Sequence, residues 1–260
     1  IGGTKVDGTD ATNTISYMAL QATKECMTHQ PTLSCRIHPD CPPEFMEAVT
    51  ELVSTGCGFP AIHGDRTGYQ MLSNLGYEPK DAKDWNGCVV PHSRKTFQWT
   101  SAASISFAAA LEFALNEGKS RLSGEQVSVP EKDPKTFTSI DEIIEAWKNQ
   151  FRYLVKQGVI SLVTAQEIHR ESGHRPFMSA CNEYCLKNGK DLVDGGAKYS
   201  IGPVFTGVGL SVTANSLAVI KKLVFEDKKY TLSEVIDAIN ANWEGYEQLR
   251  QEALACPKYG

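Results

Sequence analysis

The segment from Trp85 to His92 holds the residues best suited to chemistry, because it places one thiol, Cys88, at a Gly-Cys turn between two apolar stretches. Glycine permits a close backbone approach that other residues resist, so Gly87 is able to present the Cys88 sulfur at the tip of a tight loop. A thiol presented in this way can be a nucleophile, a metal ligand or a radical carrier. The spacing alone leaves all three open, together with the structural alternative that Cys88 is a small buried hydrophobic residue.

Other chemical motifs are weak. Cys88 with His92 could form a thiolate nucleophile, but a hydrolase also needs an orienting carboxylate and an oxyanion site, and neither is visible. The Gly207-Val208-Gly209 run lacks the third glycine and the Lys-Ser/Thr of a phosphate loop. His169 and His174 are five residues apart and do not share a helix face, so no metal site is expected.

The cysteines do not form a disulfide or zinc framework. No Cys-x-x-Cys occurs, and the single Cys-x-x-x-Cys, Cys181 with Cys185, has no matching pair. The expected helix over 178–187 would place these two thiols one turn apart on a buried stripe. Reduced thiols in the cytoplasm are therefore expected. The eight are Cys26, Cys35, Cys41, Cys57, Cys88, Cys181, Cys185 and Cys256.

Composition is that of an ordinary globular protein, with 260 residues, 41% hydrophobic and 22% charged, and a net charge of -5. Scattered Lys and Arg give no basic face, so neither nucleic acid nor an anionic membrane is an expected partner. No apolar run approaches the roughly 20 residues of a membrane helix. Because the chain starts at Ile1 without Met and stops abruptly, we expect residues 1–260 to be a single partial domain of a longer protein.

Helical and extended segments alternate, which favours an α/β architecture, with a barrel whose strand loops carry the site. Ser34 and Arg36 share one strand face, and a buried Arg there requires an ion pair. The segment 123–138 is expected on the surface. Apolar periodicity predicts helices over 14–26, 42–53, 68–75, 102–116, 141–156, 178–187, 211–225, 231–242 and 246–255, and extended segments over 33–38, 59–62 and 200–206.

Five motifs in register along nearly the whole chain resemble those of the glycyl radical enzymes, the pyruvate formate-lyase-like group. The motifs are Asp10-Ala11-Thr12-Asn13 with Ser16-Tyr17, His29 to Arg36, Gly87-Cys88, Gly195 to Tyr199 with Gly202-Pro203, and Asn242 to Tyr246. The resemblance implies the central and late part of a ten-stranded β/α barrel. It also implies that the C-terminal glycyl radical domain is absent from this sequence.

The resemblance implies radical chemistry at Cys88. In such enzymes a separate activating enzyme, using S-adenosylmethionine and an iron-sulfur cluster, installs a glycyl radical in the C-terminal domain. That radical takes hydrogen from the loop thiol, here Cys88, and the thiyl radical takes hydrogen from a small organic substrate inside a dry barrel. No cofactor bound by this chain itself is expected, and the full-length protein is expected to be a homodimer.

Two departures from family members bear on the reaction. Many members, including diol dehydratases and choline lyase, carry a Glu two residues after the cysteine as acid or base, whereas this chain has Val90. Pyruvate formate-lyase has adjacent cysteines, and Cys88 has none. The expected reaction is therefore C–C cleavage by an arylacetate decarboxylase-like lyase acting on a hydrophobic carboxylate. The alternatives are a glycerol or propanediol dehydratase-like or choline lyase-like C–O or C–N lyase, hydrocarbon addition to fumarate, formate acetyltransferase, and an inactive scaffold without the glycine loop.

Four residues are candidate substrate contacts. Val90 would belong to an apolar wall, and His92 would face a carboxylate or supply the proton that Glu supplies elsewhere. Tyr199 and Ile201 follow the Gly195-Gly196 turn on a strand that lines the cavity in the family. Barrel filling is the alternative role for both.

Four further residues downstream of Cys88 have two interpretations. Arg94 or Lys95 could face a substrate carboxylate, but such residues are more often solvated. Phe97 and Trp99 suit an aromatic substrate, but more often belong to the core.

Overall fold

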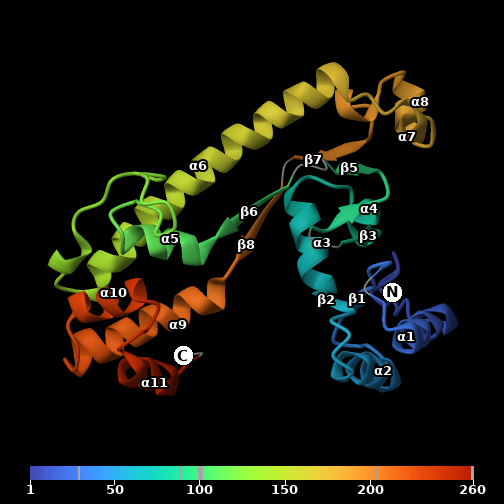
Figure 1. The fold of residues 1–260 in the computed structure, drawn as a ribbon. Coiled ribbons are helices and arrows are strands. Elements are labelled where there is room, and N and C mark those ends of the chain that lie inside the picture. The colour runs from blue at the N-terminus through green and yellow to red at the C-terminus, as the bar shows by residue number, and fades with distance from the viewer. Residues whose placement is uncertain (29, 88–89, 99–101, 203, 259–260) are drawn as a thin grey trace. The chain divides into compact units, whose positions relative to one another are not determined.

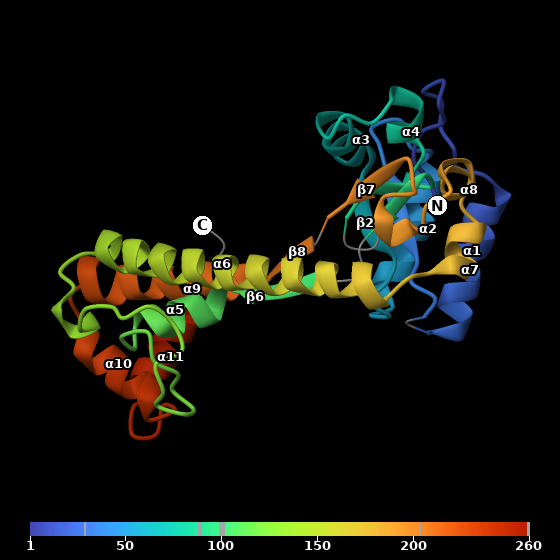
Figure 2. The same cartoon turned by 90° about the horizontal axis from the view of Figure 1, so that it is seen from above.

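A computed structural model describes residues 1–260 except 29, 88–89, 99–101, 203 and 259–260. It divides the chain into two compact units. Unit 1 comprises Ile1–Thr100 and Ile168–Val204, and unit 2 comprises Ser101–Glu167 and Phe205–Gly260. Both units contain helices and strands (Figures 1 and 2), which confirms the α/β class. The expectation of one partial domain over 1–260 stays a prediction.

Unit 1 begins with a β-α-β arrangement. Strand β1 (Ser34–Ile37) pairs in parallel with β2 (Ala61–Gly64), with Ser34 opposite Ala61. Helix α2 (Pro43–Ser54) connects them, and helix α1 (Thr14–Cys26) packs beside α2. Asn13 caps α1 by accepting from the backbone N–H groups of Ile15 and Ser16. The core between these elements comprises Leu20, Cys35, Phe45, Val49, Leu52 and Cys57.

The rest of unit 1 surrounds a short hairpin. Helices α3 (Asp65–Asn74) and α4 (Pro79–Lys83) lead into β3 (Trp85–Asn86), which pairs antiparallel with β4 (His92–Ser93). Strand β5 (Thr96–Gln98) then pairs in parallel with β7 (Tyr199–Ile201). The short elements α7 (Pro176–Ala180), α8 (Glu183–Asn188) and η2 (Leu192–Asp194) precede β7.

Unit 2 is mainly helical. Strands β6 (Ala102–Ser106) and β8 (Val204–Val208) lie side by side. Its helical elements are α5 (Phe107–Ala114), η1 (Pro134–Thr136), most of α6 (Ile140–Ser172), α9 (Leu210–Ile220), the π-helical turn η3 (Lys221–Glu226), α10 (Leu232–Asn240) and α11 (Glu247–Ala255). Their buried faces form one apolar core, comprising Leu111, Ala114, Leu115, Phe137, Ile143, Ala146, Ile220, Val224, Leu232, Val235, Ile236, Ala238 and Leu249.

The expected helix over 102–116 is wrong in its first turn. Residues Ala102–Ser106 form β6, and α5 begins only at Phe107. The Ser106 side chain accepts from the Ala109 N–H at 3.1 Å and so caps the helix at this point. Pairing with β8 therefore overrides the helical propensity of the alanines.

Two further helices differ from their expected ranges. The expected helix over 178–187 is two short helices, because Asn182 accepts from the N–H groups of Tyr184 and Cys185 and starts α8 anew. Cys185 is buried, but Cys181 is exposed, so the two thiols do not share a buried stripe. Helix α6 continues well beyond the expected end at Lys156, to Ser172.

Candidate active site

The Gly87-Cys88 segment lies between the two strands of the β3–β4 hairpin along the chain. Asn86 lies opposite His92 in the hairpin register, so residues 87–91 form its connection. Cys88, the candidate catalytic thiol, lies in this connection but outside the described residues. A side-chain carbon on Gly87 would come within 3.2 Å of the Val90 carbonyl oxygen and 3.3 Å of the Pro91 nitrogen. The two ends of the connection therefore approach closely at Gly87, where the tight contacts favour glycine.

Gly87 is fixed to the neighbouring structure through both of its backbone polar groups. The Ser34 hydroxyl on β1 donates to the Gly87 carbonyl oxygen at 2.7 Å. The Gly87 N–H donates to the Asn86 side-chain oxygen at 2.8 Å. Gly87 is itself buried. The residue that precedes Cys88 is thus held in place by a strand of the sheet and by its own hairpin.

The Arg36 side chain supports the start of this hairpin. Its guanidinium donates to the carbonyl oxygens of Trp85 at 2.8 Å and Lys83 at 3.0 Å. It also lies over the Trp85 ring, 4.5 Å from the ring centre. Arg36 pairs with Asp65 through Nε at 2.7 Å, and the other Asp65 oxygen accepts from Thr4 at 2.7 Å. The structural ion pair expected for Arg36 is confirmed, and Asp65 is its partner.

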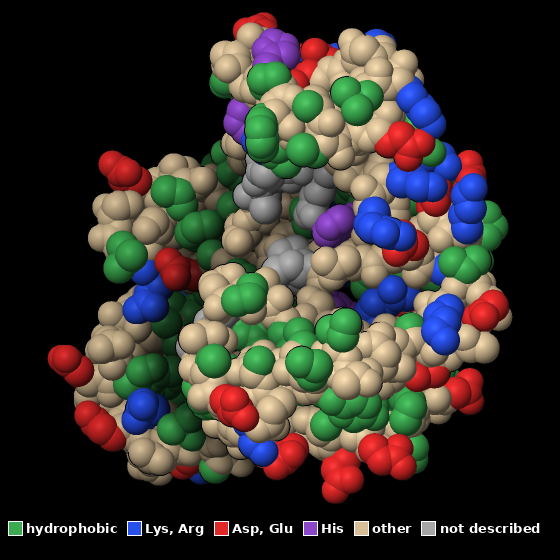
Figure 3. All heavy atoms as spheres, turned by 90° about the vertical axis from the view of Figure 1, so that its right-hand side faces the viewer, with side chains coloured by type: hydrophobic (Ala, Val, Ile, Leu, Met, Phe, Trp, Pro, Cys, Tyr) green, Lys and Arg blue, Asp and Glu red, His purple; other side chains and the backbone are tan. Residues whose placement is uncertain are grey.

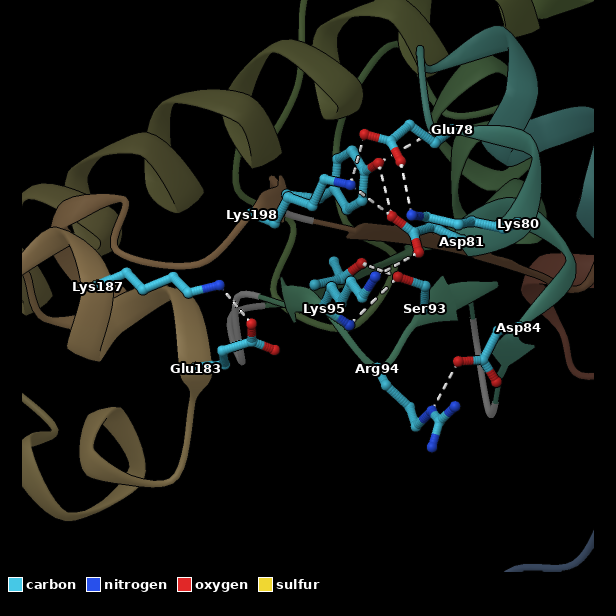
Figure 4. Close-up of polar contacts among 12 residues, drawn as sticks. Glu78, Lys80, Asp81, Asp84, Ser93, Arg94, Lys95, Glu183, Lys187 and Lys198 are labelled. Atoms are coloured by element: carbon cyan, nitrogen blue, oxygen red, sulfur yellow. Dashed lines mark hydrogen bonds and ion pairs between the residues drawn. The ribbon is translucent and has the colours of Figure 1, made fainter.

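A second buried carboxylate, Asp81, joins α4 to the strands that follow (Figure 4). Its oxygens accept from Lys95 and Lys198, each at 2.7 Å, and from the Tyr199 hydroxyl at 3.0 Å. Burial opposes ionisation of this group, but hydrogen bonds from Lys198, Lys95 and Tyr199 outweigh it and lower the pKa of Asp81 to about 2. Lys198 also pairs with Glu78 at 2.7 Å, and the pKa of Lys198 is raised by these bonds to Asp81 and Glu78.

Two of the four candidate substrate contacts lie together at the end of the loop. The His92 Nδ1 atom is 3.0 Å from the Val90 carbonyl oxygen, and both residues are partly buried. Because a carbonyl oxygen only accepts, Nδ1 carries the hydrogen in this contact, and Nε2 is the atom left to exchange a proton. The structure therefore brings His92 and Val90 to the same end of the connection that holds Cys88.

The other two candidates, Tyr199 and Ile201, lie on β7. The Tyr199 ring stacks on Tyr77 with ring centres 3.8 Å apart. Its hydroxyl donates to Asp81 and accepts from the Glu78 N–H at 3.1 Å. Tyr199 and Ile201 both pack against a small cluster that contains Trp85. This geometry fits the alternative role of filling the barrel interior, and among the described residues neither side chain is hydrogen-bonded to His92.

The residues downstream of the loop divide between core and surface. Phe97 is buried in a cluster with Cys185, Leu192 and Val193. Arg94 has an 85% exposed side chain and pairs with Asp84 at 2.6 Å. Lys95 is bound to Asp81, and Trp99 lies outside the described residues.

The chain belongs to the pyruvate formate lyase-like family, whose model matches residues 1–260. It is 34% identical over its whole length to an isethionate sulfite-lyase from Bilophila wadsworthia, of which it covers 32%. It is 32% identical to a (2S)-3-sulfopropanediol dehydratase from Klebsiella oxytoca, with 96% of this chain and 30% of the relative aligned. The chain thus spans about a third of the length of these relatives.

A solved structure confirms the expected fold. The glycerol-bound B12-independent glycerol dehydratase from Clostridium butyricum matches all of this chain and 33% of its own, with a TM-score of 0.85 and 34% identity. The chain is therefore a portion of the larger α/β barrel of this family.

The comparisons favour the dehydratase-like alternative over the expected decarboxylase. The 4-hydroxyphenylacetate decarboxylase glycyl radical subunit from Clostridium scatologenes is 28% identical, with 100% of this chain and 31% of the relative aligned. The dehydratases and sulfite-lyases above are more similar. Val90 was thus too narrow a basis for preferring decarboxylation over elimination.

The charged side chains are distributed over the face shown in Figure 3 as their scatter along the sequence predicts. Figure 3 shows Lys and Arg side chains next to Asp and Glu side chains, without a large patch of one sign on that face. Among the described residues no helix is long and apolar enough to cross a membrane. The seven cysteines that the structure describes are all reduced.

Proposed function

We propose that the full-length protein is a glycyl radical lyase of the dehydratase type, which eliminates a hydroxyl or sulfonate group from a small alcohol. The observation that carries the proposal is the tightly packed Gly87, held by Ser34 and Asn86 directly before Cys88. A residue held in this way directly before the thiol suits a cysteine that must repeatedly meet the same substrate atom, because small displacements of reacting groups cost rate. The similarity to dehydratases and sulfite-lyases supports the reaction class.

The proposed reaction uses Cys88 as a reversible hydrogen carrier. A glycyl radical in the rest of the full-length protein takes the hydrogen atom of this thiol, so the S–H bond breaks, a C–H bond forms on the glycine and Cys88 becomes a thiyl radical. Cys88, as a thiyl radical, takes a hydrogen atom from the carbon that bears one hydroxyl, and an S–H bond forms. The neighbouring hydroxyl takes a proton and leaves as water, the retained hydroxyl gives up its proton as its C–O bond becomes a carbonyl, and Cys88 returns its hydrogen atom to the product radical. A 1,2-diol thereby becomes an aldehyde and water, and the thiyl radical is regenerated.

His92 is the proposed proton donor for the leaving group. Val90 has no proton to give, and the bond between His92 Nδ1 and the Val90 carbonyl oxygen at 3.0 Å fixes the ring at this end of the loop. Its Nε2 is then the atom that gives the proton to the leaving group.

The proposal extends to partners and location. An activating enzyme that uses S-adenosylmethionine and an iron-sulfur cluster would install the glycyl radical. The full-length protein would be a cytoplasmic homodimer, in keeping with its reduced cysteines.

The proposal is tested by finding which class of substrate the protein converts. The full-length protein is activated anaerobically and supplied separately with 1,2-propanediol, glycerol, isethionate, phenylacetate and 4-hydroxyphenylacetate. We expect an aldehyde product from at least one of the first three and no decarboxylation of the last two. Turnover of the arylacetates alone would overturn the proposal in favour of a decarboxylase.

The role of His92 is tested separately on whichever substrate reacts. We expect His92→Ala to lower kcat by about 100-fold or more, the usual contribution of a positioned acid. His174→Ala, at a histidine with a 51% exposed side chain, is the matched control. Placing Glu at position 90 in the His92→Ala background should restore part of the loss. Full turnover by His92→Ala would rule His92 out as the donor.

A further inference from the structure

We propose that Asp10, His38 and Cys41 form a zinc-binding site in unit 1. The three residues come from the loop before α1, the end of β1 and the turn before α2. One potential ligand atom from each lies within 4.8 Å of the other two. A carboxylate, an imidazole and a thiol are the side chains that zinc prefers.

The three groups lie near enough for small side-chain movements to form a tetrahedral site. Zinc–ligand bonds of about 2.0–2.3 Å place neighbouring ligand atoms about 3.3–3.8 Å apart. The Asp10 carboxylate and His38 Nε2 are 2.9 Å apart, so a slight opening of this pair would admit the ion. The side chains of His38 and Asp10 are 6% and 24% exposed, so the site is shielded but within reach of solvent.

Neighbouring groups already hold the ligands in position. Thr12 donates to the two Asp10 oxygens, one from its N–H and one from its hydroxyl, each at 3.0 Å. The backbone N–H of His38 donates to the Cys41 sulfur at 3.3 Å. Hydrogen bonds of this kind to metal-binding side chains are usual at metal sites, because they fix the orientation of the ligands.

The ligand types also select the ion. Zinc binds cysteine as the thiolate, so the Cys41 thiol would release its proton when the metal binds. The thiol and imidazole favour zinc over magnesium or calcium, which prefer oxygen ligands alone.

The ion would connect the loop before α1, the end of β1 and the turn before α2. That strand supplies Ser34, which anchors Gly87, and Arg36, which supports Trp85. The proposed role of zinc is therefore to stabilise the support of the loop rather than to act on substrate. It is independent of the reaction proposed above.

The experiment uses the metal-stripped full-length protein under anaerobic conditions, titrated with Zn²⁺ and, as a spectroscopic probe, with Co²⁺. We expect one equivalent to bind, thiolate-to-cobalt charge-transfer absorption, and a rise in Tm with Zn²⁺. Cys41→Ser should abolish the charge-transfer absorption, and Thr12→Val should weaken binding by about tenfold. Cys26→Ser, at an exposed cysteine at the end of α1, is the matched control and should change neither.

Three outcomes would overturn the proposal. They are absence of the charge-transfer absorption in the wild-type protein, its persistence in Cys41→Ser, and a Tm that does not respond to Zn²⁺. Far-UV circular dichroism of Cys41→Ser and Cys41→Ala shows whether either variant has lost its fold. Loss of the absorption in folded variants of Cys41, with the Cys26→Ser signal intact, assigns it to this site.

Discussion

The interior of unit 1 and the interior of unit 2 are stabilised by different kinds of interaction. Unit 2 buries one continuous apolar core between its helices. Among the described residues of unit 1, three smaller apolar clusters are accompanied by two buried carboxylates, Asp65 and Asp81, each 4% exposed. Charge-assisted hydrogen bonds are directional, whereas apolar packing tolerates small shifts. The polar unit is the one that holds the Gly87 loop, so directional bonds lie where position matters for chemistry.

The largest expected difference in the free energy of unfolding concerns the ion pair between Arg36 and Asp65, which supports the hairpin. Asp65→Asn removes the charge that compensates the nearly buried Arg36, and we expect it to lower the free energy of unfolding by about 3–5 kcal/mol. Arg94→Gln, which breaks the exposed pair with Asp84, should cost less than about 1 kcal/mol. Urea denaturation of the full-length protein measures both. Equal effects would contradict a special role for the buried pair.

Two glycines in helices, one in each unit, allow the tightness of packing in the two units to be compared. A side-chain carbon on Gly68 in α3 would lie 2.2 Å from the Trp85 ring, which is fixed under Arg36. On Gly158 in α6 it would lie 2.7 Å from Phe205, whose side chain is partly exposed and able to rotate away. We expect Gly68→Ala to destabilise by about 2–3 kcal/mol, since overpacking exceeds the gain in helix propensity.

Gly158→Ala should stay within about 1 kcal/mol of wild type, because better helix propensity offsets the displaced ring. Thermal unfolding of the two variants in parallel is the measurement. A Gly68→Ala protein as stable as wild type would show that the hairpin base is not tightly packed.

Acid sensitivity should also differ between the units. The pKa of Asp81 is lowered from 3.8 to about 2, so its stabilisation is complete above about pH 4 and is lost as the pH falls toward 2. We expect about 2 kcal/mol of acid-dependent stability from this group, and Asp81→Asn should remove it. The pKa of Glu142 in unit 2 is also about 2, chiefly through the Thr138 N–H.

Glu142 is 36% exposed at its side chain, so solvent weakens its contribution. Glu142→Gln should therefore change the pH dependence of unfolding less than Asp81→Asn does. Denaturation midpoints between pH 2 and 6 measure the difference. A larger flattening of the pH profile by Glu142→Gln than by Asp81→Asn would contradict the comparison.

The smallest effect on stability is expected at Ser34. Ser34→Ala removes the hydrogen bond to the Gly87 carbonyl and should cost about 1 kcal/mol in the free energy of unfolding. Ser54→Ala, which removes an exposed bond to the Glu51 carbonyl, is the matched control. We expect kcat of the activated enzyme to fall in Ser34→Ala alone, because the loop is less well positioned. Unchanged kcat would indicate that Ser34 does not position the loop.

Local signals in the sequence were sufficient for much of the fold. Asn13 before an apolar period predicts α1 and its cap, and alternation after Pro31 predicts β1. The 102–106 segment shows the limit, because its alanines favour a helix while pairing with β8, about a hundred residues away, makes it a strand. Helix propensity is a local quantity, and strand pairing is not.

The candidate site shows the same limit. Gly87 and the ion pair of Arg36 could be predicted, since a tight turn and a buried guanidinium each impose a local requirement. The partners Asp65 and Ser34 could not be assigned to these roles, because the contacts depend on tertiary structure. The same holds for the meeting of Asp10 with Cys41, since sequence spacing reveals only ligands that lie close along the chain.

Dependence of turnover on Cys88 tests the central claim most directly. The full-length enzyme and its Cys88→Ser variant are activated anaerobically, the glycyl radical is quantified in each by electron paramagnetic resonance, and elimination of 1,2-propanediol, glycerol and isethionate is followed. The account predicts comparable radical content, product from the wild type and none from Cys88→Ser. Product formed by Cys88→Ser at the wild-type rate would contradict it.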